Sequence, residues 1–364
     1  PEFAALWPEK FTNVTNGVTP RRWVGLANPK LSALLNESIG EGWINRLDEL
    51  RKLEQFVDDS SFLERWQATK LTVKGQLSHY IHRHTGVLVD PTSLFDVQVK
   101  RIHEYKRQHL NALQVVAQYL RIKNGQADGM APRTVIFGGK AAPGYYMAKL
   151  IIRFINGIAE TINADPDMEG RLRVIFLADY NVKLGERVYP ASDLSEQIST
   201  AGTEASGTGN MKFALNGALT IGTWDGATIE MAEAIGESEV FVFGHRADGI
   251  EKLRDLGYLP LWIAQQNPAL HAVLDAIGRG VFNPGEPTRY KALIDDLIGR
   301  DRYFLLADFA DYVAAQQRVD ALYAQPARWQ AAVARNIAGM GGFSSDRTVQ
   351  TYVERVWSRK SLES

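Results

Sequence analysis

Short apolar runs alternate with longer amphipathic segments through the middle of this chain. The apolar runs are rich in β-branched and aromatic residues and lie at 94–99, 134–138, 173–177, 218–223 and 239–243. Segments with helical spacing of apolar positions follow the first three runs, at 107–123, 141–160 and 182–189. Because strands that alternate with helices build βαβ units, this pattern predicts an α/β fold with a parallel sheet and flanking helices.

The two ends of the chain have a different pattern. The first 85 residues and the last 80 read mainly as helix, with apolar helical spacing over 61–84 and around 303–336. The chain shows no repeat of fixed period, and the stretch 280–287 reads as a loop rather than as a domain linker. We therefore predict one large domain over 1–364, with the terminal helices covering or extending the sheet.

Composition narrows the classes of function. The chain has 364 residues, of which 45% are hydrophobic and 23% charged, so it can bury a large core. Its formal net charge of −1 provides no global basic field for nucleic acid or an anionic membrane. The absence of cysteine excludes disulfides and thiolate chemistry, and we expect a cytoplasmic protein. No apolar run approaches the roughly 20 residues that cross a bilayer. Residue 1 is not Met and the first residues resemble the interior of a longer sequence, so we expect a fragment.

A glycine-rich segment carries the first candidate chemistry. Residues 204–212 read EASGTGNMK and lead into a predicted helix. Gly207 and Gly209 let the backbone approach an anion closely, and N–H groups at a helix start favour a phosphate. An amine beside such a loop suits a phosphorylated aldehyde such as pyridoxal phosphate, which Lys212 would hold as a Schiff base. The segment lacks the spacing of a nucleotidase phosphate loop and the third glycine of a dinucleotide fingerprint. A strand-to-helix turn without a ligand is the alternative.

A cationic cluster follows the first predicted strand. Residues 100–107 read KRIHEYKR. At the carboxyl end of a strand these groups face the usual ligand crevice, where a phosphate would offset their mutual repulsion. A solvated helix face is the alternative for such a charge run. The segment 138–140 (GGK) also ends a strand, and we predict a tight turn that lines the same crevice. His79, His82 and His84 are predicted to lie on a surface helix rather than to bind a metal, since only the first two share a helical face.

These motifs, in their order along the chain, resemble those of the α-glucan phosphorylases, the family of glycogen, starch and maltodextrin phosphorylases. The resemblance rests on 15–23 (TNGVTPRRW), 100–107, 138–141 (GGKA), 193–197 (DLSEQ), 204–218 and 225–227 (DGA), and it covers essentially the whole chain. It implies the C-terminal, cofactor-binding Rossmann-like domain of a glycosyltransferase-B type architecture. The N-terminal domain would be absent, and helices at about 330–364 would pack toward it.

The resemblance also implies a bound cofactor and the residues that hold it. Pyridoxal 5′-phosphate would form a Schiff base with Lys212. Its phosphate would lie near Lys100, Lys106 and the backbone of Thr208 and Gly209. Tyr180 and Trp23 would pack beside the cofactor, and no metal site is expected.

The implied reaction is phosphorolysis of an α-1,4-glucan by inorganic phosphate, giving α-glucose 1-phosphate with retained configuration. Lys100, Arg101 and Lys106 would be the catalytic cations that offset the negative charge of two neighbouring phosphates. The substrate-binding residues would be Asn16, Glu204, Ser206 and Gly207.

The resemblance further implies that the full-length protein is a homodimer, and we expect little or no activity from the fragment alone. A sugar-nucleotide glycosyltransferase of the same architecture is one alternative function. A noncatalytic glucan-binding module is the other.

Overall fold

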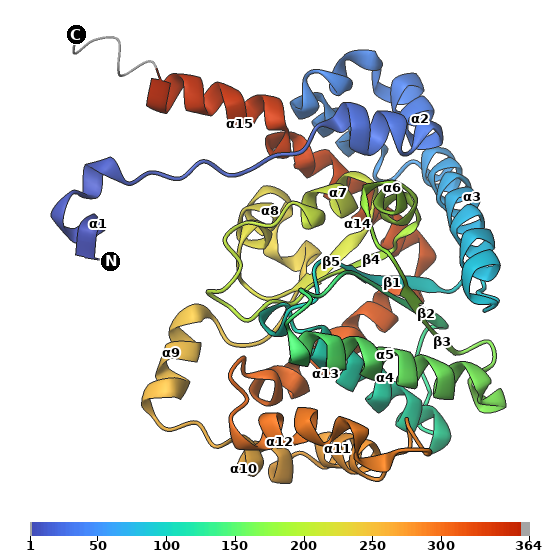
Figure 1. The fold of residues 1–364 in the computed structure, drawn as a ribbon. Helices are drawn as coiled ribbons and strands as arrows, with labels where there is room; N and C mark the ends of the chain where they lie inside the picture. Colours follow the sequence, from blue (N-terminus) through green and yellow to red (C-terminus); the bar gives the residue numbers. More distant parts are fainter. Residues whose placement is uncertain (1, 358–364) are drawn as a thin grey trace.

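A parallel sheet forms the centre of the protein. The computed structural model describes residues 2–357, and within them six strands form one sheet in the order β3-β2-β1-β4-β5-β6 (Figure 1). The strands are β1 (Leu94–Val99), β2 (Arg133–Gly138), β3 (Leu172–Leu177), β4 (Leu194–Gln197), β5 (Leu219–Gly222) and β6 (Phe241–Val242). Neighbouring strands are parallel throughout, and the direction of winding reverses between β1 and β4. This is the strand order of a doubly wound, Rossmann-like sheet, so the predicted α/β fold is confirmed.

Helices cover both faces of this sheet (Figure 1). One side carries α4 (Gln108–Lys123), α5 (Tyr146–Ala164), α11 (Pro268–Gly278), α12 (Lys291–Gly299) and α13 (Leu305–Tyr323). The other side carries α3 (Ser60–Thr85), α6 (Val182–Ala191), α7 (Gly209–Leu215), α8 (Ala227–Ile235) and α14 (Pro326–Ala338). Further helices are α1 (Glu2–Leu6), α2 (Pro29–Ile39), α9 (Ala247–Asp255), α10 (Pro260–Gln266) and α15 (Ser345–Tyr352).

Local sequence signals explain where several helices begin and end. The Asp59 side chain accepts a hydrogen bond from the amide of Phe62 and caps the start of α3, and Gly86, in the left-handed conformation, follows its last residue. Helix α5 begins at Tyr146 rather than at the predicted 141, because Pro143 and the following glycine form a turn. The predicted helical stretch 303–336 is divided between α13 and α14 at Pro326, which occupies the first turn of α14.

Strand β4 was missed by the sequence pattern because it is polar. Its residues read LSEQ, yet Leu194, Ser195 and Glu196 are buried. Glu196 accepts a hydrogen bond from the Gln316 amide at 2.7 Å. Burial and the nearby Asp96 raise the pKa of Glu196 well above its ordinary value, so the folded protein favours its uncharged form. A partner from a distant segment therefore bonds to one Glu196 oxygen, while the other is buried without a hydrogen-bond partner among residues 2–357.

The last predicted strand is shorter in the structure than in the sequence pattern. The pattern indicated 239–243, but β6 contains only Phe241–Val242 and follows a 3-10 turn, η7 (Glu237–Glu239). This strand lies at the edge of the sheet and pairs with β5 alone, so only the residues that bond to β5 are counted as strand.

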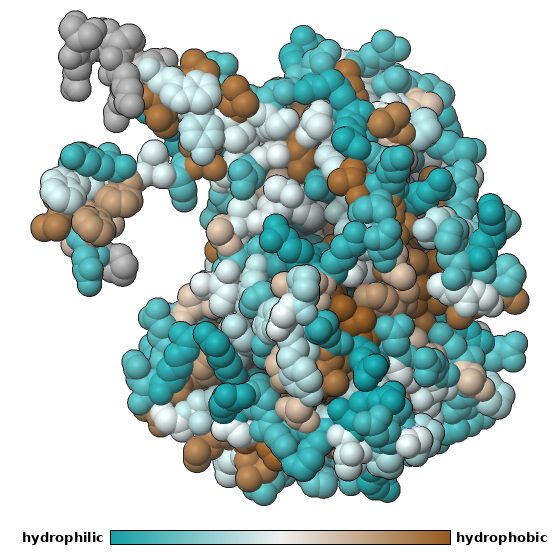
Figure 2. Space-filling model, in the orientation of Figure 1, coloured by the Kyte–Doolittle hydropathy of each residue, from teal (hydrophilic) through white to brown (hydrophobic). Residues whose placement is uncertain are grey.

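Both ends of the described chain extend away from the main body. Figure 1 shows α1 and α15 reaching out on the same side, and Figure 2 shows apolar atoms on both segments. Phe3 and Leu6 are each 66% exposed, and Trp357 is 56% exposed. The packing of about 330–364 toward another domain stays a prediction, and its part from 358 onward lies outside the described residues. Among the helices of residues 2–357, none combines the length and the apolar character that a bilayer span requires.

Candidate active site

A cavity of about 430 Å³ opens at the carboxyl ends of β1 and β4. This is the point where the winding of the sheet reverses, and ligands of doubly wound sheets bind at such a point. The lining comes from the end of β1 and the segment after it, from Gln197 on β4, and from the glycine-rich segment. The lining residues are Val99, Lys100, Arg101, His103, Tyr105, Lys106, Gln197, Glu204, Gly207, Thr208 and Gly209. The fold thus brings together two motifs that lie a hundred residues apart in the chain.

Two lysines of the cationic cluster have fixed partners in this cavity. The Lys100 amine donates to the Gln197 side-chain oxygen at 2.9 Å, and the Lys106 amine donates to the Glu204 carboxylate at 2.6 Å. Burial, together with the charge of Lys106, lowers the pKa of Lys100 to about 8. Burial alone would raise the pKa of Glu204, but the hydrogen bond and charge of Lys106 lower it. With three cations and one carboxylate on its wall, the cavity suits an anion.

The cluster is held in place by its last residue. Arg107 has a left-handed backbone (φ 55°) and a fully buried side chain. Its guanidinium donates to the Asp308 carboxylate at 2.6 Å and to the carbonyl oxygen of Ile198 at 2.6 Å. The carbonyl oxygen of Lys106 accepts a hydrogen bond from the Gln98 amide at 3.0 Å. The loop that presents Lys106 is therefore tied to the sheet and to α13.

The glycine-rich segment forms the opposite wall. Gly207 has a left-handed backbone (φ 78°), and Thr208 precedes the first turn of α7. A Cβ atom at Gly209 would meet no protein atom within 4 Å, so a side chain there would occupy the cavity itself. The Asp225 carboxylate accepts the amides of Thr203 and Glu204, at 3.2 Å and 2.8 Å, and so fixes the start of the segment.

Lys212 lies one helical turn beyond Gly209 and does not itself line the cavity. Its side chain is half-buried, with the amine 4.2 Å from the centre of the Trp23 ring and 5.7 Å from that of Tyr189. Burial, and then the charge of Arg22, lower the pKa of Lys212. In the part of the chain that the structure describes, neither a carboxylate nor a hydrogen-bond acceptor pairs with this amine. An unpaired, aromatic-backed amine with a lowered pKa has the properties of a reactive lysine.

The structure places the other predicted site residues as follows. Trp23 is buried beneath the Lys212 amine, and Tyr180 reaches the same aromatic group through a 3.0 Å hydrogen bond between its hydroxyl and that of Tyr189. Ser206 lies in the glycine-rich segment, where its hydroxyl bonds to the Gly207 carbonyl rather than lining the cavity. Asn16 is exposed, and the structure does not bring it to the cavity wall.

Sequence reasoning missed several residues of this region. Gln197 partners Lys100, and Tyr105 lies under the Lys106 amine, 4.5 Å from its ring centre. Tyr189 packs edge-on between Trp23 and Phe213, with ring centres 5.4 Å and 4.7 Å away. Gln197 and Tyr105 had a signal in the sequence, because they stand in the motifs 193–197 and 100–107, whereas Tyr189 stands in no such motif. The segment 138–140 was predicted to form a tight turn that lines the same crevice, but Gly138 ends β2, the turn lies at 143–144, and none of the three residues lines the cavity. A Cβ at Gly139 would lie 2.0 Å from the Lys100 carbonyl oxygen, so only glycine allows this close approach.

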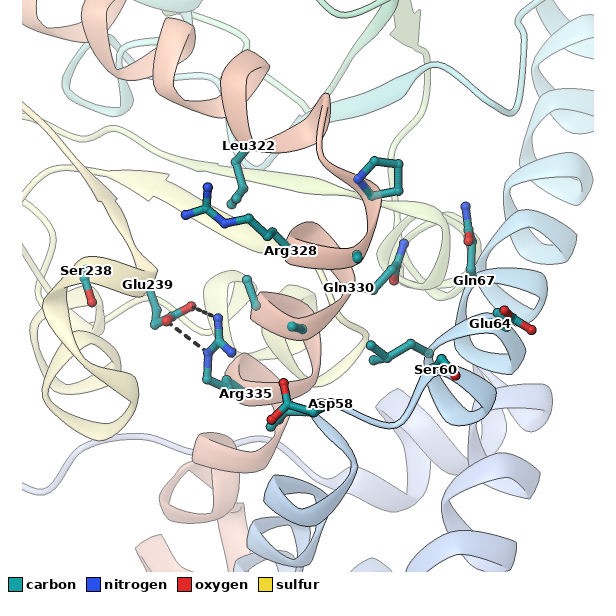
Figure 3. A pocket seen from close by; sticks show the side chains of 16 residues that line it. Asp58, Ser60, Glu64, Gln67, Ser238, Glu239, Leu322, Arg328, Gln330 and Arg335 are labelled. Atoms are coloured by element: carbon teal, nitrogen blue, oxygen red, sulfur yellow. Dashed lines mark hydrogen bonds and ion pairs between the residues drawn. The ribbon is translucent and has the colours of Figure 1, made fainter.

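A larger cavity, of about 810 Å³, lies elsewhere in the molecule, between α3, α14 and η7 (Figure 3). Its arginine at 335 is paired with Glu239, at 3.0 Å, and Asp58 and Glu64 also line it. Its two arginines, Arg328 and Arg335, face three carboxylates, so this cavity has no excess of cations, and it is remote from the carboxyl ends of the strands. The smaller cavity is the better candidate for an anion site because its cations outnumber its carboxylates. Residues 2–357 contain no group of three or more His, Cys, Asp or Glu side chains that could hold a metal ion. His79, His82 and His84 are exposed on α3.

Fold and site together define a Rossmann-type α/β domain with a cation-rich cavity and an unpaired lysine amine beside it. Residues 1–359 match the carbohydrate phosphorylase family. The chain is 54% identical over 361 residues to a glycogen phosphorylase of Synechocystis, and 51% identical over 356 residues to the human muscle form of glycogen phosphorylase. These matches cover 99% and 98% of the chain but only 42% of either relative. The chain belongs to the carbohydrate phosphorylase family, and it spans less than half the length of these relatives.

Proposed function

We propose that this chain is the cofactor-binding, C-terminal part of a pyridoxal-phosphate-dependent α-glucan phosphorylase. One observation carries the proposal: an unpaired, half-buried lysine amine lies one helical turn from a glycine-edged cavity with three cations on its wall. This arrangement suits a small molecule that has an aldehyde at one end and a phosphate at the other. The names of the relatives support glucan and inorganic phosphate as the substrates.

The residues present fit pyridoxal 5′-phosphate. The Lys212 amine would bond to the aldehyde carbon of the cofactor. Trp23 lies against this amine, and Tyr180 is linked to the same group by its hydrogen bond to Tyr189. Lys100, Lys106 and the backbone at Thr208 and Gly209 would hold its phosphate, since all of them line the cavity. When bound, the cofactor would supply a phosphate group that acts as a proton donor or relay beside the substrate phosphate.

The chain's own side chains would bind and orient the reactants. Arg101 and Lys106 would bind the inorganic phosphate, and Lys100 would offset the charge between the two phosphate groups. Glu204, Ser206 and Gly207 would contact the sugar hydroxyls, together with Asn16. Because Glu204 is bonded to Lys106 in this structure, one sugar contact and one phosphate contact would be coupled.

Reduction with borohydride in the presence of pyridoxal 5′-phosphate tests the proposal. We expect a stable adduct on Lys212, identified by peptide mass, and none in Lys212→Arg, which keeps the charge but cannot bond to the aldehyde in the same way. Lys140→Arg is the matched control, because Lys140 also follows two glycines at the end of a strand but pairs with Asp179 in solvent. Labelling spread over surface lysines, with none at Lys212, would favour the sugar-nucleotide glycosyltransferase instead.

The proposal extends to the activity of the parent enzyme. The chain 1–364 alone should release little or no glucose 1-phosphate from glucan, because it spans only 42% of the relatives' length. Substitution of Arg101 in the full-length enzyme should abolish most activity. Full activity after that change would favour a noncatalytic glucan-binding module.

A further inference from the structure

The buried asparagine at the end of α7 has an unusual set of partners. The Asn216 side-chain amide donates to the carbonyl oxygen of Lys212 at 2.9 Å and to that of Trp23 at 2.8 Å. Since both acceptors are carbonyl oxygens, the orientation of the amide group is fixed. Its own oxygen accepts a hydrogen bond from the Asn28 amide at 3.0 Å. One side chain thus joins the backbone of the lysine to a segment almost two hundred residues earlier in the chain.

An irregular helix makes the Trp23 carbonyl available. Residues Arg21–Leu26 form a π-helix, η2, and the amide of Ala27 bonds to the carbonyls of Arg22 and Val24 instead of that of Trp23. The next amide, that of Asn28, bonds to the Val24 carbonyl at 2.8 Å. Neither the Ala27 amide nor the Asn28 amide therefore bonds to the carbonyl oxygen of Trp23. The Asn216 side-chain amide supplies a donor to this buried carbonyl instead.

The two backbones joined in this way carry the two groups that meet beside the cavity. The Trp23 ring lies 4.2 Å from the Lys212 amine, and Tyr189 packs edge-on against the same ring. Neither side chain is held to the other by a directional bond. Their separation therefore depends on the spacing of η2 and α7, which the Asn216 amide sets.

We propose that Asn216, oriented by Asn28, is a positioning residue for Lys212: it fixes the amine against the Trp23 ring so that the amine can reach an aldehyde bound in the neighbouring cavity. This inference rests on the proposed function. It adds two asparagines that are not part of the cavity wall.

The test measures how fast the adduct forms at Lys212 with subsaturating pyridoxal 5′-phosphate and borohydride. The sharpest variant is Asn28→Asp, because the substituted carboxylate keeps an oxygen that caps α2 at the Leu31 amide and replaces the donor to Asn216 with a second acceptor, which repels the Asn216 oxygen. We expect adduct formation to slow by about tenfold or more, since small displacements of a reacting group have effects of this size. Asn216→Ala should have a larger effect. In both variants the pH midpoint of the reaction should move upward, toward that of an ordinary lysine, because the amine is less buried.

Asn336→Ala is the matched control. The Asn336 amide donates to the carbonyls of Ala214 and Ala218, on either side of Asn216, at 3.3 Å and 3.2 Å. It is buried like Asn216 and also holds the end of α7, but it contacts neither Trp23 nor Lys212. We expect this variant to lose stability and to keep the wild-type rate and pH midpoint.

Three results would overturn the inference. One is a wild-type rate in Asn28→Asp, which remains informative if Asn216→Ala does not fold. A second is an equal slowing in Asn336→Ala, which would mean that general loosening of α7 is the cause. The third is a wild-type chain that forms no adduct at Lys212, and that result alone would also refute the proposed function.

Discussion

Single buried side chains set the electrostatics of this protein. Burial lowers the pKa of both Lys100 and Lys212, and a neighbouring cation, Lys106 for Lys100 and Arg22 for Lys212, lowers it further. His109 is the same kind of residue outside the site. It lies at the start of α4 beneath Phe154, with ring centres 5.7 Å apart, and residues 2–357 offer it no hydrogen-bond partner. Its burial therefore has a cost that appears when the pH changes.

The His109 ring should make the protein sensitive to acid. Burial lowers its pKa to about 4, from an unfolded value near 6.5. The unfolded chain thus binds more protons between those values, so stability is present above pH 6.5 and is lost as the pH falls toward 4. The loss should be on the order of 3 kcal/mol. Urea unfolding of His109→Phe across this range should show a flatter pH dependence than the wild type, while His82→Gln, on the exposed end of α3, should not.

Elements of the fold act on the site through a few buried bonds. Helix α13 lies outside the cavity, yet its Asp308 carboxylate accepts the Arg107 guanidinium on one oxygen and both the amide and the ring of His245 on the other. Arg107 directly follows Lys106 in the cavity wall. A helix near the end of the chain therefore fixes a loop that follows the first strand.

Asp308→Asn should destabilise the protein by about 3 kcal/mol, because it leaves the buried Arg107 charge without its counter-ion. The anion site should weaken with it, since the loop that presents Lys106 loses its anchor. Urea unfolding measures the first effect, and titration with inorganic phosphate measures the second. Asp311→Asn is the control on the same helix, because Asp311 is exposed and bonds only to the Gly244 amide. Equal losses in the two variants would contradict this account.

At the scale of the whole molecule, two buried lysines of α3 connect this helix to segments that are far away in the sequence. The Lys70 amine donates to the carbonyl oxygens of Pro190, Ser192 and Asn216, at distances of 2.7–2.8 Å. Lys74, one turn later, pairs with the Asp193 carboxylate. These contacts connect the long helix to the end of α6, the start of β4 and the end of α7.

Lys70→Met should cost about 3 kcal/mol or more, because it leaves three buried carbonyl oxygens without a donor. Thermal unfolding should show a clear drop in the midpoint, and the end of α7 should exchange its amide hydrogens faster. Lys30→Met, at an exposed position on α2, should change neither. An unchanged midpoint in Lys70→Met would show that water replaces the amine.

The sequence by itself determined the strands β1, β2, β3 and β5, because their apolar runs must be buried whatever packs on them. It also indicated that the cationic and glycine-rich motifs bind an anion, since lysine and arginine side chains and exposed backbone amides attract negative charge. Only the tertiary structure decided that β4 is a strand, that the two motifs form one cavity, and that Lys106 is paired with Glu204. The polar residues of β4 need Gln316 and Asp96, and the Lys212 amine needs Trp23; all three of these partners come from distant parts of the chain. Apolar periodicity is a local property, whereas the satisfaction of buried polar groups is settled only when those parts meet.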